Sequence, residues 1–232
     1  MKILAFDSTS LTASVAVCED ERLLGEITLN NGNTHSETLL PMAEQLFRML
    51  SITADDIDIF AASSGPGSFT GVRIGVATVK GLAFGRNKPC VGISTLEALA
   101  YNLRAYKGII CPVMNARRGQ VYTAIFESDG KEIKRLSEDM AIAATELDLK
   151  LFALSSDVYL VGDGIDVATS CFEKTVVSYT PEESRYQSGY SVAQVALNEY
   201  KNSRYVSDKE LVSTYLRLSQ AERERLEKEN NQ

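Results

Sequence analysis

The fold of this chain is decided by residues 2–29, KILAFDSTSLTASVAVCEDERLLGEITL. Three short runs of apolar or β-branched residues lie within this stretch, at 2–8, 12–18 and 22–29, and only a few turn residues separate each run from the next. Connections this short join antiparallel neighbours. We therefore expect an antiparallel meander of three strands at one edge of a sheet.

Helical and strand patterns alternate after this meander. The first helix is expected at 34–50, because Thr34 and Glu37 have the spacing of a capping box. A strand at 57–63, a helix at 70–84, a strand at 90–93, a helix at 95–106 and a strand at 109–115 follow. This order favours an α/β fold with a mixed β-sheet flanked by helices.

The second half of the chain repeats this scheme in a looser form. Strands are expected at 119–127, 131–136 and 158–162, helices at 145–153 and 190–203, and a turn at 162–164. We predict two small lobes, 1–106 and 107–218, each with a mixed sheet flanked by helices. A charged C-terminal tail, 219–232, follows them. Its mixed charges favour a solvated helix, and a contact with a third subunit is the alternative.

The composition is that of an ordinary globular protein, with 44% hydrophobic and 24% charged residues among 232. The net charge of −7 argues against a protein that itself holds nucleic acid, because binding to phosphates depends on a cationic face. No apolar run has the length of a membrane span and no signal peptide is recognisable, so we expect a cytoplasmic protein. The four scattered cysteines are expected to be reduced and mostly buried: Cys18, Cys90, Cys111 and Cys171.

The most specific segment is SGPGSFTGVRIG at residues 64–75. Glycines between a strand and the start of a helix can cradle a phosphate, yet this segment matches neither a P-loop nor the dinucleotide fingerprint. Gly71 and Gly75 lie four residues apart on one helical face, where a second helix could approach closely. Close helix packing is the favoured interpretation, and anion binding and a simple tight turn are the alternatives.

The apolar face of the first expected helix spans about 180°, which is wider than the stripe that covers a single core. A face of this width, with Met42 and Met49 on one flank, suits an adaptable contact with another protein. The alternative is a helix that is buried deeply in the core of its own chain. The apolar residues are Leu39, Leu40, Met42, Ala43, Leu46, Phe47, Met49 and Leu50.

Two short polar segments follow expected strands, at 7–10 and 162–164. Each could contact a metal-bound phosphate, or each could be a simple turn. His35 is the single histidine, so paired histidines of this chain cannot hold zinc or iron, and we expect its ring to bond locally or to face an interface. We expect no catalytic residue, metal or cofactor. A vestigial phosphate site would consist of Asp7, Ser8, Thr9, Ser10, Gly162 and Gly164.

Four segments together resemble the TsaB (YeaZ) family: ILAFDSTS at 3–10, THSETLLP at 34–41, the segment 64–75, and YLR at 215–217 followed by Ala221 and Glu222. The resemblance covers most of the chain and is weaker from 125 to 210. It implies the ASKHA fold, which is the fold of actin, of heat-shock chaperones and of sugar kinases. It also implies a role in forming N6-threonylcarbamoyladenosine at adenosine 37 of tRNAs that read codons beginning with A.

The resemblance further implies a non-catalytic paralogue of TsaD, the subunit that carries the metal and the transferase site. TsaE would be a third, ATP-hydrolysing partner, and tRNA would be met only indirectly through the complex. Contact with TsaD is implied to use the helices at 34–50 and 70–84, and we expect a homodimer when the partner is absent. The expected interface consists of Leu39, Met42, Ala43, Leu46, Phe47, Leu50, Gly71, Val72, Arg73, Gly75, Thr78, Val79 and Leu82.

Two positions depart from the pattern of the family. Asn115 stands where relatives usually have aspartate, which removes one carboxylate of a two-lobed phosphate site, and Thr214 stands where proline is common. The first departure argues against nucleotide hydrolysis. An ATP-dependent phosphotransferase or a peptidase on the same scaffold, centred on Asp7 and the loop 64–71, is the alternative function.

Overall fold

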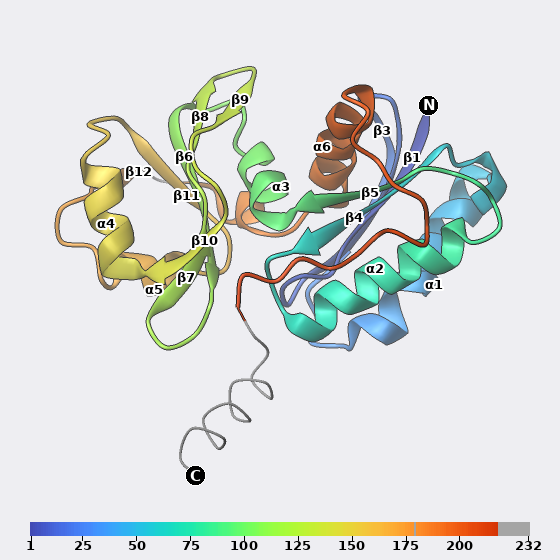
Figure 1. Ribbon diagram of the computed structural model, residues 1–232, viewed down its shortest axis with the longest axis horizontal. Helices are drawn as coiled ribbons and strands as arrows, with labels where there is room; N and C mark the ends of the chain where they lie inside the picture. Colours follow the sequence, from blue (N-terminus) through green and yellow to red (C-terminus); the bar gives the residue numbers. More distant parts are fainter. Residues whose placement is uncertain (179, 218–232) are drawn as a thin grey trace, which may run out of the picture.

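The computed structural model describes residues 1–178 and 180–217, which form two lobes side by side (Figure 1). Each lobe is built on a mixed β-sheet with helices on its faces. The expected two-lobed α/β architecture is confirmed, while the predicted tail 219–232 lies outside the described residues. In the part of the chain that is described, no helix is both long and apolar enough to cross a membrane.

The first lobe contains a five-stranded sheet with the order β3-β2-β1-β4-β5. The first three strands pair antiparallel, and the last two extend the sheet in parallel. The meander predicted from residues 2–29 is therefore confirmed as one edge of the sheet. The strands are β1 (Lys2–Asp7), β2 (Ala13–Glu19), β3 (Arg22–Leu29), β4 (Ile59–Gly65) and β5 (Cys90–Ser94).

Helices cover both faces of this sheet. Helices α1 (His35–Leu50) and α2 (Phe69–Ala83) lie on one face, and α6 (Gly189–Lys201) lies on the other (Figure 1). Side chains of a strand point alternately to the two faces. In β1, Phe6 accordingly packs in the core with α1 and α2, while its neighbour Ala5 packs in the core with α6.

The second lobe contains a seven-stranded sheet with the central order β10-β7-β6-β11-β12. Strands β8 and β9 form a hairpin that joins this sheet by pairing with β6. The elements are β6 (Lys107–Asn115), β7 (Gln120–Thr123), β8 (Phe126–Asp129), β9 (Ile133–Arg135), β10 (Met140–Ala143), α4 (Ala144–Phe152), β11 (Val158–Val161), α5 (Ile165–Thr169) and β12 (Val177–Ser178). Two short 3-10 helices, Ala54–Asp56 and Glu182–Arg185, complete the described elements.

Helix α3 (Thr95–Tyr101) lies between the two lobes (Figure 1). Its buried side chains Leu96 and Leu99 pack with Ile110 of β6 and Phe126 of β8. The helix is shorter than the predicted 95–106 because the chain continues as successive tight turns.

The predicted division into lobes at 1–106 and 107–218 is corrected at its C-terminal end. Helix α6 packs on the first sheet, and Leu211 belongs to the apolar cluster beneath α1 and α2. The chain after residue 188 therefore returns to the first lobe, because the face of the first sheet opposite α1 and α2 is also apolar and must be covered.

Two local predictions are also corrected. The expected strand 119–127 is interrupted, because the backbone N–H of Ile125 bonds to the side chain of Ser137 instead of continuing the ladder. Thr34 precedes α1 as predicted, but its side chain makes no capping hydrogen bond, and the N–H of Glu37 bonds to the Thr34 carbonyl oxygen.

Candidate functional site

A cleft of about 470 Å³ lies between the two lobes. The parallel strands β1 and β4 end at the same edge of the first sheet, so the loops that follow them meet there. The end of β6 and the turn after β11 form the facing wall. The lining residues are Thr9, Ser10, Leu11, Gly67, Ser68, Phe69, Thr70, Met114, Asn115, Ala116, Arg117, Tyr122 and Asp163.

Asp7 is buried beneath this cleft, with only 1% of its surface exposed. One carboxylate oxygen accepts hydrogen bonds from the backbone N–H and the hydroxyl of Thr9, at 2.9 and 2.7 Å, and the other accepts from the Ser63 hydroxyl at 2.5 Å. Burial raises the pKa of Asp7, against the lowering effect of these hydrogen bonds. The carboxylate thus stabilises a turn. The sequence allowed this interpretation as the alternative to contact with a metal-bound phosphate.

The polar groups at the mouth of the cleft are bonded to one another. The Ser10 hydroxyl donates to Asp163 across the cleft at 2.6 Å, and the other carboxylate oxygen of Asp163 accepts from the backbone N–H of Asn115 at 3.1 Å. The Asn115 side chain in turn accepts from the N–H of Arg117 at 2.8 Å. Of the predicted phosphate-site residues, Thr9 and Ser10 line the cleft, and Ser10 bonds to Asp163, which stands between the predicted Gly162 and Gly164.

Gly162 and Gly164 are explained by the packing of their turn on β6. Gly162 has a φ of +111°, and a β-carbon there would overlap the Val113 carbonyl oxygen. A β-carbon on Gly164 would lie 2.8 Å from the carbonyl carbon of Met114. Both glycines allow backbone to approach backbone, and this requirement accounts for them without a ligand.

The glycines of the segment 64–75 also serve a close approach, but the partner is not a second helix. A β-carbon on Gly71 would overlap the Ser8 carbonyl oxygen, and one on Gly75 would lie 2.7 Å from the Ser8 hydroxyl oxygen. Helix α2 therefore packs tightly on the turn that follows β1. The prediction that Gly71 and Gly75 mark a helix crossing is wrong, because both positions face the interior of the chain.

The predicted interface residues are mostly internal as well. Eight of the thirteen are buried, because they form the inner sides of α1 and α2: Leu39, Met42, Ala43, Leu46, Gly71, Val72, Gly75 and Val79. Four are half-buried, namely Phe47, Leu50, Thr78 and Leu82, and Arg73 alone among the thirteen is exposed. The buried eight cannot form the outer surface of the folded chain, so the prediction is corrected for them.

The outward sides of the same two helices carry apolar and small residues that the expected interface set left out. Met49 of α1 is 70% exposed, and Phe84 at the end of α2 is 71% exposed. Between the two ends of α2, Ala77 and Gly81 lie exposed and four residues apart. A β-carbon on Gly81 would have no atom within 4 Å. At 3.6 residues per turn, the six residues from Gly75 to Gly81 place Gly81 on a different side of α2 from the inner pair, and this offset could have been read from the sequence.

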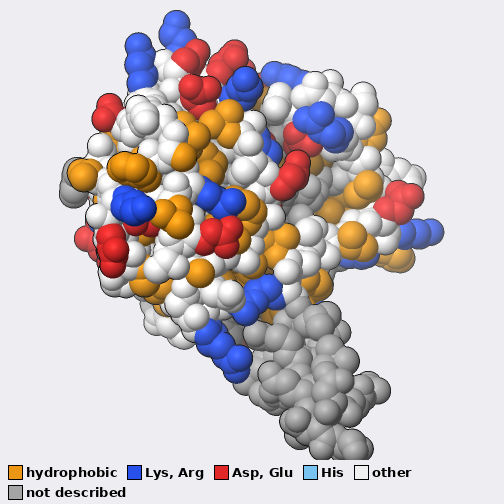
Figure 2. Space-filling model, turned by 60° about the vertical axis from the view of Figure 1, so that its left-hand side comes forward, with side chains coloured by type: hydrophobic (Ala, Val, Ile, Leu, Met, Phe, Trp, Pro, Cys, Tyr) orange, Lys and Arg blue, Asp and Glu red, His pale blue; other side chains and the backbone are white. Residues whose placement is uncertain are grey.

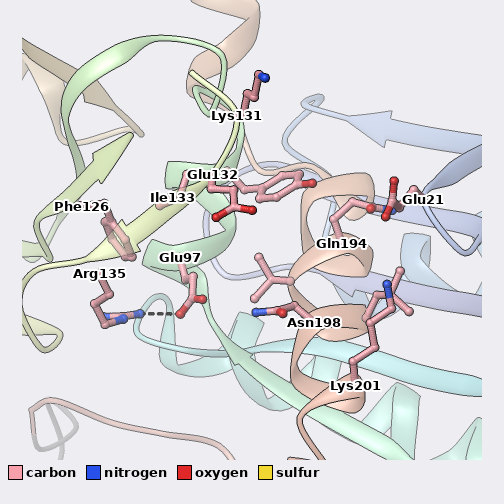
Figure 3. A pocket seen from close by; sticks show the side chains of 13 residues that line it. Glu21, Glu97, Phe126, Lys131, Glu132, Ile133, Arg135, Gln194, Asn198 and Lys201 are labelled. Carbon is pink, nitrogen blue, oxygen red and sulfur yellow. Dashed lines mark hydrogen bonds and ion pairs between the residues drawn. The ribbon is translucent and has the colours of Figure 1, made fainter. Parts of the chain in front are cut away.

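A second cavity, of about 410 Å³, lies on the other side of α3, between α6 and the β8–β9 hairpin (Figure 3). The Arg135 side chain of the hairpin donates to Glu97 of α3 at 2.8 Å and to Asp139 at 2.7 Å. It also lies over the ring of Phe126, 4.7 Å from its centroid. This cavity was not predicted from the sequence, because its walls come from segments far apart in the chain.

The remaining predicted groups are placed as follows. Nε2 of His35 lies 2.7 Å from the Ser10 carbonyl oxygen, so the ring contacts the turn after β1 and makes no local bond within its own helix. Within residues 1–178 and 180–217, no three His, Cys, Asp or Glu side chains are placed to hold a metal ion. Three of the four free cysteines are buried, and Cys171 is half-buried. Figure 2 shows acidic, basic and hydrophobic side chains intermixed on one face of the molecule.

Comparison with known proteins relates the chain to a tRNA modification pathway. Residues 22–224 match the family model of TsaD, tRNA N6-adenosine threonylcarbamoyltransferase. The tRNA threonylcarbamoyladenosine biosynthesis protein TsaB of Bacillus subtilis is 30% identical over 231 residues, which is 96% of each chain. TsaB of Escherichia coli is 33% identical over 167 residues, which is 71% of this chain and 72% of that protein.

Solved structures support the fold. YeaZ from Pseudomonas aeruginosa has a TM-score of 0.82 at 23% identity, over 93% of this chain and 99% of that one. The ethanolamine utilization protein EutJ from Carboxydothermus hydrogenoformans has a TM-score of 0.52 at 12% identity, over 84% of this chain and 90% of that one. The fold expected from the sequence is thereby confirmed.

Proposed function

Because the chain belongs to the TsaB family of tRNA threonylcarbamoyladenosine biosynthesis proteins, we propose that it is a non-catalytic subunit that docks onto a TsaD-like transferase and activates it. The transferase forms N6-threonylcarbamoyladenosine at adenosine 37 of tRNAs that read codons beginning with A. This chain meets the tRNA only through the complex. The net charge of −7 fits a subunit that leaves the holding of tRNA to a partner.

The observation that carries this proposal is the exposed row of small residues on α2. Glycine within a helix costs about 1 kcal/mol relative to alanine, and Gly81 has no contact inside the chain that requires it. Ala77 and Gly81 leave a flat strip along which the backbone of a partner helix can approach closely. Met49 of α1 and Phe84, which directly follows α2, expose apolar side chains that a partner can bury on docking.

The non-catalytic assignment is supported by the state of the cleft. An enzyme with its active site in this cleft would need polar side chains free to face a substrate. Asp7, Ser10 and Asp163 are instead hydrogen-bonded to other residues of the chain. The alternative of a phosphotransferase or peptidase needs these groups to face a substrate, and the names of the relatives do not favour it.

Further partners are proposed from the membership of the chain in the TsaB family. A TsaE-like ATPase is a third member of the complex, and the complex works in the cytoplasm, where tRNA is found. Without the transferase, the exposed strip on α2 pairs with that of a second copy, because uncovered apolar surface favours association.

Binding of a TsaD-like transferase to Gly81→Arg tests the proposal. An arginine at this open position leaves the fold intact and blocks close approach, so we expect co-purification to be lost. Thr145→Arg, on exposed surface of α4 in the second lobe, is the matched control and keeps the affinity of the wild type. Unchanged affinity of a folded Gly81→Arg variant contradicts the proposed surface. Gly75→Arg is unsuitable, because it fills the space of the Ser8 hydroxyl.

A further inference from the structure

The C-terminal strap, residues 206–217, runs along the first lobe and ends between the two lobes (Figure 1). Val206 pairs with the edge strand β5, and the N–H of Thr214 donates to the Ser64 carbonyl oxygen at 2.7 Å. Leu211 is buried in the apolar cluster beneath α2. Up to Thr214, the strap is therefore held on the first lobe by backbone bonds and by apolar packing.

Tyr215 is clamped on the first turns of α2. Its ring stacks on that of Phe69 with 4.0 Å between the centroids and 6° between the planes. Arg73 donates to the Tyr215 hydroxyl at 2.9 Å, and its guanidinium lies 4.8 Å from the centre of the Phe69 ring. Stacking and a cation over the ring together hold the phenol in place.

Two residues further on, the strap reaches the second lobe. The Arg217 guanidinium donates to the carbonyl oxygen of Ala116, in the loop between β6 and β7, at 2.8 Å. Phe69 and Ala116 line opposite walls of the cleft. The pair Tyr215 and Arg217 therefore spans the cleft from one wall to the other, on the same side as the hydrogen bond from Ser10 to Asp163.

The opposite side of the molecule is joined differently. Helix α3 packs through Leu96 and Leu99 on the second sheet, and Leu103, in the turns after it, joins the same apolar cluster. The Asn102 side chain accepts from the Ser191 hydroxyl of α6 at 2.6 Å. Apolar packing of this extent resists separation more than a few exposed hydrogen bonds do. A relative motion of the lobes that preserves this packing would pivot about α3 and separate the two walls of the cleft.

The second cavity, between α6 and the β8–β9 hairpin, is called the rear cavity here, and it provides room for this motion. It lies across α3 from the cleft, so a rotation that opens the cleft moves the β8–β9 hairpin towards α6 (Figures 1 and 3). The hairpin carries Lys131 and Glu132, and the facing wall carries Glu21 and Lys201. Both walls of the cavity therefore carry charges of both signs.

We propose that Tyr215 and Arg217 form a latch that holds the cleft closed, and that release of this latch lets the second lobe rotate about α3, so that the cleft opens while the rear cavity closes. The latch acts within the single chain and does not depend on the proposed partner. It assigns a role to the YLR segment at 215–217, which the docking surface on α2 leaves unused. The device is of the hinge type, in which a few residues at the edge of a packed contact control closure.

Distances between pairs of spin labels on the full chain test the latch. One pair, Glu37→Cys and Thr145→Cys, joins exposed positions of the two lobes. Glu37 lies two residues after His35, which bonds to Ser10 at the cleft, and Thr145 follows Ala144, whose N–H bonds to Gly119 in the β6–β7 loop. The other pair, Lys131→Cys and Lys201→Cys, lies across the rear cavity. Both pairs are placed in a Cys171→Ser background, because the other three cysteines are buried. Tyr215→Ala combined with Arg217→Ala releases the latch, and Lys209→Ala changes an exposed strap side chain outside it.

We expect the double variant to gain a population with longer distances across the cleft and shorter distances across the rear cavity, while Lys209→Ala matches the wild type. Unchanged distributions in the folded double variant overturn the latch. Broadening of both distributions without the opposite shifts also overturns it, because that result describes general loosening. Circular dichroism checks the fold. Should the double variant not fold, Arg217→Ala alone, which removes one hydrogen bond, is judged by the same outcomes.

Discussion

The hydroxyl of Ser8 donates a hydrogen bond to the carbonyl oxygen of Gly71 over 2.9 Å, and the carbonyl oxygen of Ser8 fills the space that a β-carbon on residue 71 would need. The turn after β1 and the first turns of α2 thus touch backbone to backbone. This contact sets the position of α2 on the first sheet, and with it the position of the exposed strip on the outer side of the same helix.

Alanine at the inner and outer glycines of α2 should change stability in opposite directions. Gly71→Ala forces the Ser8 turn away and should cost about 1–3 kcal/mol, the usual range for overpacking. Gly81→Ala meets open space and should stabilise the chain by about 0.5–1 kcal/mol through helix propensity. Urea denaturation of both variants measures the two effects, and changes of the same sign would contradict this assignment of the inner and outer faces.

Asp7→Asn should leave the protein folded and able to activate a transferase. The amide oxygen still accepts from Thr9, and the amide nitrogen can donate to the hydroxyl of Ser63. Asp7→Ala leaves these buried groups without a partner and should lower the free energy of unfolding by about 1–3 kcal/mol. Denaturation and a transferase assay of the complex measure both properties. A stable Asp7→Asn variant that binds the transferase but gives no product would show that the carboxylate takes part in the chemistry.

Asp148 should make the stability of the second lobe sensitive to acid. Burial raises its pKa, but hydrogen bonds from the backbone N–H groups of Glu173, Thr175 and Lys174 outweigh burial and hold the pKa below its ordinary value. A lowered pKa contributes stability that is fully present above the unfolded value of about 3.9 and is lost as the pH falls through the folded value.

The free energy of unfolding of the wild type should therefore exceed that of Asp148→Asn by a constant amount at neutral pH. The difference should shrink below about pH 4, where the carboxylate begins to be protonated in the unfolded chain. Urea titrations of both proteins at several pH values measure it. A difference that stays constant down to the acid transition is incompatible with a carboxylate stabilised by these hydrogen bonds.

Thiol labelling of the native protein should modify Cys171 quickly and the other three cysteines slowly. Burial raises the pKa of Cys18 and Cys111 to about 12 and that of Cys90 to about 11, so these thiols carry almost no thiolate at pH 8. An Ellman assay with and without denaturant counts fast and total thiols. Two or more fast thiols in the folded protein would disagree with the packing of the two sheets.

Local patterns predicted the parts of the fold that depend on neighbouring residues. The antiparallel meander of β1–β3 follows from short turns between apolar runs, and α1 and α2 begin and end within a residue or two of the predicted positions. The apolar face of α1 was recognised from its periodicity. Whether such a face covers the chain's own sheet or a partner cannot be read from periodicity, because both surfaces have the same pattern. Leu39 and Leu46 were therefore assigned to the wrong surface.

Contacts between distant segments were beyond the sequence argument. The return of α6 to the first sheet joins residues that are about 190 positions apart, and no local signal marks the sheet on which an apolar helix will pack. The pairing of Ser10 with Asp163 across the cleft depends equally on the arrangement of the two lobes. Both segments were identified as polar turns, but their mutual bond required the structure.

Formation of N6-threonylcarbamoyladenosine on tRNA by purified subunits tests most directly whether this chain is a non-catalytic partner. We expect no product from this chain alone, stimulation when it is added to a TsaD-like transferase with the remaining components of the pathway, and loss of that stimulation in Gly81→Arg. Product formed by this chain with no second protein present would contradict the proposed role.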